Sequence, residues 1–525
     1  MPPCAAMTPA SYDVVVAGAG PVGLTLGGLL ARRGLRCAVV DRAAARTDKS
    51  KALVVWPRTL ELLAAAGMEE AFLAAGSKAR GGRLFGRGRQ LAWLDFSRSG
   101  AAYPFSLMIP QSETERLLEA EAQAAGVALQ RETEVLRFAA AADGVDVALR
   151  GGDGGERVVR CGWLVGCDGA HSAVRHGLGL AFAGSAEDND WFLADVHIDG
   201  ALPRDEVSLF LHPDGVLACF PIPPNRFRVL GDLGAAHGEH PRDPTLADVQ
   251  ALLARRGPGA LTVRDPVWLA GFRINERQVP SYRRGRVLLA GDAAHIHSPA
   301  GGQGMNTGMH DAFNLAWKLA LVHQGRARAD LIDTYDAERH PIGALVVRGA
   351  GGLTRLATIH SAAGQRLRDA VVSRAYSVRR LSDLVVGVLT EVAIHYRGSR
   401  LSRDERSALT RLRARRGGVR AGERAPDAAV SDAAGGATSL FALLRGGRHV
   451  LLLSAGVPAG LAAAVQRAYP DLVDCAVLRD PSPPYGACTA TAILVRPDGY
   501  IGYLGAPAAA PRLVAHLGTY LIPSP

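Results

Sequence analysis

Lysine is almost absent from this chain of 525 residues, because only four of its 60 basic residues are Lys and the remainder are Arg. The arginines are spread along the sequence, and the densest run, 397–424, also holds three carboxylates and no aromatic side chain. Nucleic-acid surfaces combine basic side chains with aromatic rings that stack on bases. Despite the net charge of +10, we therefore predict no nucleic-acid partner. We interpret the run 397–424 as a solvated helix face and linker.

Cysteine is also scarce, and its spacing lacks the patterns of a structural site. The seven cysteines are odd in number and form no CxxC pair or zinc-ligand spacing, which argues against a disulfide framework and favours a reducing cytoplasm. His295, His297 and His310 lie close in sequence, but no Cys or carboxylate at a recurrent spacing completes a ligand set. We therefore predict no metal site.

No apolar run is long enough and continuous enough to predict a membrane span. The uncharged segments 14–31 and 450–465 are interrupted by Gly and Pro after four or five strand-like residues, so each is interpreted as strand, turn and helix. The first residues do not have the pattern of a signal peptide, and no membrane partner is predicted. With 48% hydrophobic and 21% charged residues, the chain is outside the disordered classes.

A glycine-rich turn stands near the start of the sequence. Residues 12–17 are predicted to form a strand, 24–33 a helix and 36–41 a second strand, with the pattern GxGxxG in the turn at 18–23. Gly18 permits the tight turn, Gly20 lets the backbone approach a pyrophosphate, and Gly23 allows close helix packing. Asp41 ends the second strand, where it is expected to bind a ribose hydroxyl. This context predicts a dinucleotide site at a helix N-terminus.

Two later apolar strands also end in an acidic residue. The first strand leads to Asp168 and the second to Asp292, at the carboxyl ends where open parallel sheets bind their ligands. The loop 296–306 follows and runs into a predicted amphipathic helix over 306–323. The N-terminus of that helix is a second positive dipole end, which favours negative charge on a ligand.

These motifs together resemble a known family. In the order Gly18 to Gly23, Cys167-Asp168-Gly169, Gly291 to His295 and Pro299 to Asn306, they are similar to class A flavoprotein monooxygenases, the group of p-hydroxybenzoate and phenol hydroxylases. The longer bacterial members that act on aromatic polyketides, phenols and rifampicin are the most similar. The resemblance covers residue 11 to at least 345, and a fainter one over 494–500 extends it to their C-terminal thioredoxin-like domain.

The resemblance implies a noncovalently bound FAD. It places Asp168 near the pyrophosphate and the nicotinamide path, Asp292 at the ribityl chain, and the backbone of 304–306 at the flavin pyrimidine ring. A reduced flavin is negative on that side, which a helix N-terminus stabilises. The full set of implied cofactor residues is Gly18, Gly20, Pro21, Val22, Gly23, Asp41, Arg42, Ser50, Lys51, Gln111, Val135, Asp168, Gly169, Asp292, Gly304, Met305 and Asn306. Arg58 matches a further family segment near the cofactor.

The implied reaction is a monooxygenation. NADPH or NADH is the transient reductant and dioxygen the co-substrate, and a flavin C4a-hydroperoxide transfers one oxygen atom to an aromatic or polyketide-like molecule. Pro299 and Asn306 are expected beside the reacting ring, in a loop that excludes water. A base that forms a phenolate would assist. His212 and Tyr282 are the two candidates, although each is also typical of a turn or a packed strand end.

The expected fold class is α/β. It comprises a Rossmann-like FAD-binding βαβ fold of the glutathione-reductase type, an inserted antiparallel-sheet substrate domain and a C-terminal thioredoxin-like domain without CxxC.

Aromatic residues gather at 82–111, 190–231 and 268–282, where they would line an apolar pocket or fill the core of the inserted sheet. Because twelve residues separate Cys475 from Cys488 and no CxxC is present, thiol redox chemistry is not expected. The predicted boundaries are 11–81, 112–185 and 281–345 for the FAD-binding domain, 82–111 and 186–280 for the substrate domain, 346–424 for a helical connection and Arg-rich linker, and 425–525 for the thioredoxin-like domain.

Other functions share most of these motifs. A flavin-dependent Baeyer–Villiger or epoxidising enzyme differs only at the substrate, and a non-catalytic flavin-binding protein would retain the cofactor residues. A flavin halogenase is disfavoured because the chain has no Trp-x-Trp-x-Ile-Pro segment. The substrate, the choice between NADH and NADPH, and the oligomeric state (monomer or dimer) stay open.

Overall fold

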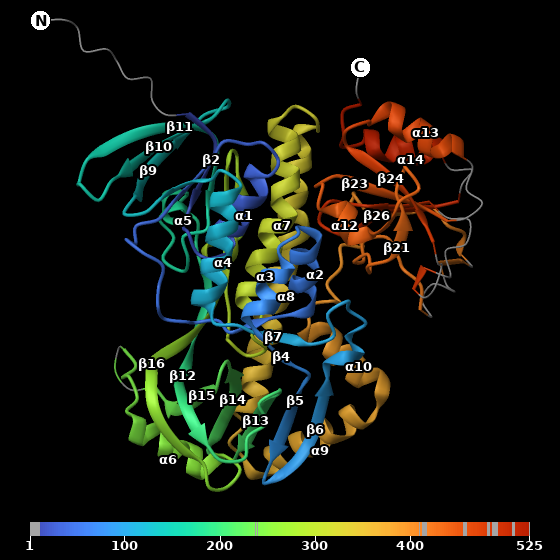
Figure 1. Cartoon of the computed structure of the whole chain (residues 1–525). Coiled ribbons are helices and arrows are strands. Elements are labelled where there is room, and N and C mark those ends of the chain that lie inside the picture. The colour runs from blue at the N-terminus through green and yellow to red at the C-terminus, as the bar shows by residue number, and fades with distance from the viewer. Residues whose placement is uncertain are drawn as a thin grey trace, which may run out of the picture.

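Figure 1 shows the computed structural model of the chain, in which two sheets lie one above the other and a third stands to one side. It describes residues 11–525, except 237, 239, 409, 412–416, 455–458, 480–483, 486–491, 507–509 and 524–525. Cys488 lies outside the described residues. Within the described part, no helix is both long and apolar enough to cross a membrane.

The upper sheet is the predicted dinucleotide-binding sheet. Its order is β17-β18-β11-β1-β2-β8, with β10 and β9 added as an antiparallel extension from β11. β18, β11, β1, β2 and β8 pair in parallel, so their carboxyl ends share one edge. The bounds are β1 Ser11–Ala17, β2 Cys37–Val40, β8 Ala128–Gln130, β9 Glu134–Ala140, β10 Val145–Arg150, β11 Glu156–Gly166, β17 Arg283–Arg284 and β18 Val287–Leu289.

Helices cover this sheet, and α1 lies beside the long α7 (Figure 1). The helix α1 begins at Pro21, three residues before the predicted start, because the fixed φ of proline suits the first helical position. The helix α7 begins at Gly304, two residues early, so that 304–306 form its first turn. The bounds are α1 Pro21–Ala31, α2 Pro57–Ala65, α3 Glu69–Ala75, α4 Gln111–Ala124, α5 Ala173–Gly177 and α7 Gly304–His323, with short 3-10 turns η2 Gly291–Ala293 and η3 Ala329–Ile332.

The lower sheet is the inserted one, and its strands are mostly antiparallel as predicted. The order is β19-β16-β12-β15-β14-β13-β5-β6, and only β13 with β5 pairs in parallel. α6, Leu246–Arg256, packs against β13, β14 and β16. The bounds are β5 Gly81–Gly86, β6 Arg89–Asp95, β12 Ala183–Asp199, β13 Glu206–His212, β14 Gly215–Ile222, β15 Arg226–Ala235, β16 Thr262–Gln278 and β19 His295–Ile296.

A small three-stranded sheet lies between the two large ones (Figure 1). It pairs β3 with β7 and β7 with β4, all antiparallel. A single turn η1 follows β6, and three helices then return along the molecule after α7. The bounds are β3 Val54–Val55, β4 Ser77–Ala79, β7 Ser106–Met108, η1 Phe96–Ser99, α8 Asp333–Ala357, α9 Ala362–Ser377 and α10 Arg379–Leu389.

The C-terminal sheet has the order β20-β26-β25-β23-β24-β21-β22. β23 and β24 pair in parallel across α13, and β25 and β26 form an antiparallel hairpin followed by α14, which is the βαβ then ββα succession of a thioredoxin-like domain. The bounds are β20 Arg403–Asp404, β21 Ala429–Ser431, β22 Ala437–Ser439, β23 His449–Leu453, β24 Val473–Leu478, β25 Ala492–Val495, β26 Ile501–Gly505, α12 Leu440–Leu444, α13 Ala459–Ala468 and α14 Ala510–Gly518. The predicted fold class is confirmed.

Candidate functional site

The β1–α1 turn has three glycines with three different surroundings. Gly18 has φ +100°, and a Cβ there would lie 2.3 Å from the carbonyl oxygen of Cys167. A Cβ on Gly23 would lie 1.9 Å from the oxygen of Gly18, whereas one on Gly20 would have no atom within 4 Å. Gly18 and Gly23 are therefore required by the protein itself, and Gly20 leaves open space where a ligand would meet the backbone.

Asp41 stands immediately after β2 and faces this turn. Its Oδ2 accepts a hydrogen bond from the N–H of Ala19 at 2.7 Å, and its Oδ1 accepts one from Ala43 at 2.8 Å. The carboxylate is thus fixed beside the glycine turn, at the edge of the sheet where a ribose would lie. Arg42 next to it is exposed.

The first turn of α7 points to the same region as the first turn of α1. Neither helix has a side-chain cap, so the N–H groups of both first turns are available to an anion. The two ends meet around Val22, because a Cβ on Gly291 would lie 2.8 Å from its Cγ2 and one on Gly308 would lie 2.7 Å from the same atom.

The side chain of Asn306 is used entirely within the protein. Its Oδ1 accepts from the N–H of Trp56 at 2.9 Å and from Thr59 Oγ1 at 2.8 Å, while its Nδ2 donates to the carbonyls of Val54 and Gly302. Asn306 therefore ties the first turn of α7 to β3 and α2. Only its backbone N–H remains to face a ligand.

The two predicted aspartates have unused acceptor atoms at the same edge. Asp168 accepts the N–H of Val174 with Oδ2 at 3.1 Å, but its buried Oδ1 has no hydrogen-bond partner among the described residues. The side chain of Asp292 is accessible to solvent, but protein atoms surround its carboxyl group closely. Partial loss of water raises the pKa of its carboxyl, while the charges of His295 and Lys51 oppose the change. Lys51, predicted from its segment, is thereby brought near Asp292.

The other predicted cofactor residues have different surroundings. Gln111 begins α4 and holds the 50–52 segment, since its Oε1 accepts the N–H of Ala52 at 2.9 Å and its own N–H donates to Ser50 Oγ at 2.7 Å. Val135 is buried in β9. Gly169 has φ +78° with open space around its Cβ position.

No sequence pattern indicated the buried cluster that lies behind α7. Asp311 accepts hydrogen bonds from the N–H of Gly291 at 3.0 Å, from His295 Nε2 at 2.9 Å and from Arg339 Nε at 2.6 Å. The nearby cationic groups lower the pKa of Asp311 to about 2 despite its burial. Arg339 also donates to the carbonyl of Thr307 at 3.0 Å. Asp311 thus fixes the turn that presents Asp292. A lone Asp in mid-helix has no distinguishing sequence pattern.

An apolar wall faces the loop 299–303 from the small sheet and the inserted sheet. Trp56, Phe96, Met108, Ile222 and Val386 form one buried cluster. Trp56 Nε1 donates to the carbonyl of Gly301 at 3.0 Å, which joins this wall to the loop. The exposed Pro299 opens the loop, and its carbonyl accepts the N–H of Gly302 at 2.9 Å.

Most of the predicted aromatic residues serve other cores. Phe192, Phe210 and Phe227 pack in the cluster between the inserted sheet and α6, and Trp191 packs in a third cluster beside Val372 of α9. The period-2 pattern of a strand does not say which face of a two-sided sheet is the ligand side. The structure therefore assigns these rings to sheet packing.

Neither candidate base is open to solvent beside the cofactor residues. His212 is at the tip of the β13–β14 hairpin, whereas Ile222 at the other end of β14 is in the wall beside Trp56; eight strand residues separate them by about 25 Å. Tyr282 is fully buried between His295 and His340. Burial raises its pKa well above the usual value. Neither arrangement suits a base that meets a substrate.

The guanidinium of Arg58, in the segment predicted to lie near the cofactor, makes its contacts within the protein. It is fully buried, pairs with Glu61 at 3.1 Å, donates to the carbonyl of Asp498 and stacks over the ring of Tyr500. Arg58 therefore belongs to the contact between α2 and the C-terminal domain. The sequence alone had no means of placing the C-terminal strands against α2.

The donor set fits a dinucleotide that carries phosphates and a ribose. Two uncapped helix N-termini suit anionic groups, Gly20 leaves room at the backbone, and Asp41, Asp168 and Asp292 offer acceptors for hydroxyl groups. A family model described as an FAD binding domain matches residues 11–350, and one described as the C-terminal domain of aromatic-ring hydroxylases matches 419–521.

The chain belongs to the class A flavoprotein monooxygenases, as its resemblance predicted. It is 36% identical to the 12-dehydrotetracycline 5-monooxygenase/anhydrotetracycline 6-monooxygenase of Streptomyces rimosus. The alignment spans 509 residues and covers 94% of this chain and 96% of that protein. The solved structure of anhydrotetracycline hydroxylase from Streptomyces rimosus superposes with a TM-score of 0.81 at 34% identity, over 98% of this chain and 100% of that one. This flavoprotein monooxygenase thus uses FAD, and the two matched regions together include the glycine turn, both Asp-ended strands and the C-terminal sheet apart from β20.

One relative has a different kind of name. The dialkyldecalin synthase of Streptomyces rugosporus is 32% identical over 499 residues, which cover 94% of this chain and 96% of that protein. Full-length similarity within the class A flavoproteins is therefore compatible with more than one kind of product.

Proposed function

We propose that this monooxygenase hydroxylates an aromatic, polyketide-like small molecule with NADPH or NADH as reductant. The observation that carries the proposal is the end-to-end similarity to a tetracycline hydroxylase, at 36% identity over both matched regions. The apolar wall of Trp56, Phe96, Met108 and Ile222 beside the loop 299–303 supports it, because a flat hydrophobic substrate needs such a surface.

Each part of the site has a proposed task. Bound FAD supplies hydride acceptance and the activation of dioxygen. The first turn of α7, held by Asn306, would stabilise negative charge on the pyrimidine side of the ring. Asp292 would bind the ribityl hydroxyls, Asp41 the adenosine ribose, and Asp168 would lie near the path of the nicotinamide. The loop that begins at Pro299 would exclude water, which keeps the activated oxygen from being lost as peroxide.

The test measures NADPH and NADH oxidation with a panel of phenols, anthraquinones and tetracyclic polyketides under ¹⁸O₂. We expect at least one compound to stimulate oxidation several-fold and to gain one ¹⁸O atom by mass spectrometry. Pro299→Gly should retain the stimulation but release more hydrogen peroxide per nicotinamide oxidised, because a looser loop admits water. Oxidation that no compound stimulates, or stimulation with peroxide as the sole product in the wild type, would contradict hydroxylation.

A second candidate is a ring-forming reaction without net oxidation, which the similarity to the dialkyldecalin synthase favours. The same experiment separates the two, because such a product has the mass of its substrate and forms without ¹⁸O. A Baeyer–Villiger or epoxidising reaction also adds one ¹⁸O, and fragmentation of the product distinguishes the inserted ester oxygen or epoxide from a hydroxyl group.

A further inference from the structure

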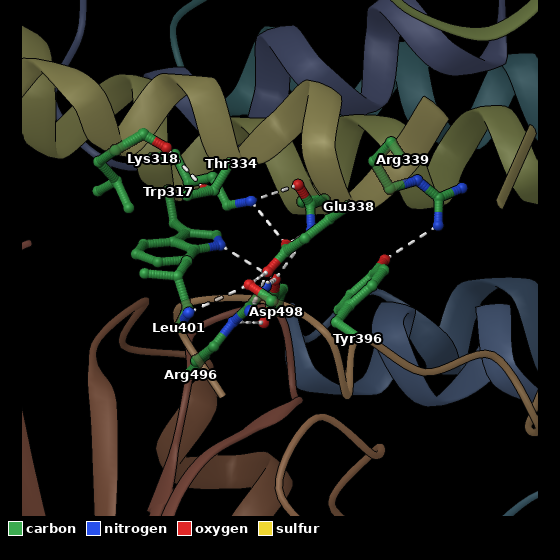
Figure 2. A network of polar contacts seen from close by, with 12 residues as sticks. Trp317, Lys318, Thr334, Glu338, Arg339, Tyr396, Leu401, Arg496 and Asp498 are labelled. Atoms are coloured by element: carbon green, nitrogen blue, oxygen red, sulfur yellow. Dashed lines mark hydrogen bonds and ion pairs between the residues drawn. The ribbon is translucent and has the colours of Figure 1, made fainter. Parts of the chain in front are cut away.

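The C-terminal domain inserts one tight turn between the helices of the FAD-binding domain. The turn 496–500 joins β25 to β26, and each of its residues is buried. It is the segment whose sequence resembles the longer members of the family. Figure 2 shows Arg496 and Asp498 reaching from this turn to the α7 and α8 helices.

Two cationic and two anionic side chains form ion pairs at this contact. Arg496 binds Glu338 of α8 with both terminal nitrogens, at 2.6 and 2.9 Å, and its Nε donates to Asp498 at 3.0 Å. Lys318 of α7 donates to Glu338 at 2.7 Å, and Trp317 Nε1 donates to Asp498 at 3.1 Å. The turn therefore binds both α7 and α8.

From the end of the turn, a chain of contacts continues to the cofactor residues. The ring of Tyr500 packs on that of Tyr396 with centroids 4.3 Å apart. The hydroxyl of Tyr396 accepts a hydrogen bond from Arg339 Nη1 at 2.9 Å (Figure 2). Arg339 in turn donates to the carbonyl of Thr307 and to Asp311.

The last two partners are the elements that present the site. Thr307 directly follows 304–306 in the first turns of α7, and Asp311 holds the N–H of Gly291, the residue before Asp292. Arg339 thus holds from behind both the helix end expected at the flavin pyrimidine ring and the turn expected at the ribityl chain. None of the predicted cofactor residues belongs to 425–525, so the C-terminal domain reaches the site through this chain of contacts.

We infer that Tyr500, Tyr396 and Arg339 are positioning residues through which the docked C-terminal domain sets the affinity and the reduction potential of the flavin. The physical basis is geometric. A shift of the first turn of α7 or of the Gly291 turn weakens both the helix-dipole stabilisation of the reduced ring and the hold on the ribityl chain. The inference rests on FAD binding and is independent of the substrate.

The decisive variant is Tyr396→Phe in the full-length holoenzyme. It removes the hydroxyl that accepts from Arg339 and keeps the ring that packs on Tyr500. We expect FAD to dissociate about tenfold faster on dilution, followed by flavin fluorescence, and the midpoint potential to move to more negative values. Tyr500→Leu, which removes the ring contact from the C-terminal side, should change both quantities in the same directions.

Arg445→Met is the matched control. Arg445 of the C-terminal domain binds Glu69 at 2.6 Å and the carbonyl of Ala64, so the variant weakens the same domain contact away from Arg339. It should leave FAD dissociation and midpoint potential as in the wild type. Unchanged flavin properties in folded Tyr396→Phe, or equal changes in Arg445→Met, would overturn the inference. If Tyr500→Leu does not fold, Tyr396→Phe against this control decides the question alone.

Discussion

At the scale of single residues, Glu391 is the most unusual ionisable group near the site. Its side chain is fully buried, Oε1 accepts the hydroxyl of Thr307 at 2.7 Å, and Oε2 lies 3.5 Å from His310 Nε2. Burial raises the pKa of Glu391 to about 8, although the Thr307 hydrogen bond and the charge of Arg339 oppose the rise. Burial also holds the pKa of His310 well below its usual value. Burial therefore favours the neutral form of both side chains.

This raised pKa predicts a pH dependence of stability. Between pH 4.5 and 8 the folded state holds up to one proton more than the unfolded state at Glu391, so the free energy of unfolding falls as pH rises through that window, by up to about 1.4 kcal/mol per pH unit. Glu391→Gln mimics the neutral acid and should abolish this part of the slope. Urea unfolding at pH 5, 6, 7 and 8 measures it, and parallel curves for wild type and variant would refute the assignment.

At the scale of elements, the β1–α1 turn separates what the fold needs from what the ligand needs. A Cβ on Gly18 would meet the backbone of Cys167, at φ +100°, whereas a Cβ on Gly20 would meet nothing within 4 Å at φ −82°. Gly18 is therefore required by the fold, whereas Gly20 is required by the expected approach of the ligand to the backbone. Similar reasoning applies at α7, where the side chain of Asn306 supports the fold and its backbone N–H is left for a ligand.

We predict opposite behaviour for substitutions at these two glycines. Gly20→Val should fold with the melting temperature of the wild-type apoprotein but retain less than about a tenth of the FAD, because the side chain would take the space next to the pyrophosphate. Gly18→Ala should lose folded protein outright, since steric overlap and a left-handed backbone act together. Circular dichroism and flavin content after gel filtration measure the two effects. A flavin-loaded Gly20→Val protein would show that the dinucleotide lies elsewhere.

At the scale of the whole molecule, buried charge holds the C-terminal domain to the helices. Arg496 and Lys318 face Glu338 and Asp498, and all four side chains are buried. Burial lowers the pKa of Lys318 to about 8, with Glu338 opposing the change. Arg496 and Lys318 hold the pKa of the Glu338 carboxyl below its usual value. Such a cluster is stable only when it is complete, because any member left alone keeps an uncompensated charge away from water.

A double-mutant cycle tests this interdependence. Arg496→Leu should lower the free energy of unfolding by about 3–5 kcal/mol, the usual effect of breaking a buried pair. Arg496→Leu combined with Glu338→Leu should lower it by less than the sum of the two single changes, because the stranded carboxylate is removed as well. Additive losses would mean that the two side chains do not depend on each other.

The glycine turn, the two Asp-ended strands, the helix after Pro299 and the inserted sheet could be predicted from sequence. Each depends on neighbours in the chain, since glycine spacing, apolar period and a strand-end acid act over a few residues. The family followed from the order of these motifs. Helix starts were misplaced by two or three residues, because Pro21 and Gly304 were assigned to the preceding loops, although Pro21 suits a first helical position.

Only the tertiary structure decided which side chains meet across long stretches of chain. Asp311 and Arg339 are 28 residues apart, Arg339 and Tyr396 are 57 apart, and Glu338 and Arg496 are 158 apart. Charged residues in amphipathic helices are ordinarily solvated, so nothing local marks these as buried. For the same reason, the sequence could not show that His212 lies at a hairpin tip, that Tyr282 is fully buried, or that Arg58 contacts the C-terminal domain. Burial and partner choice arise when helices and sheets pack, and they are properties of the whole fold rather than of any one segment.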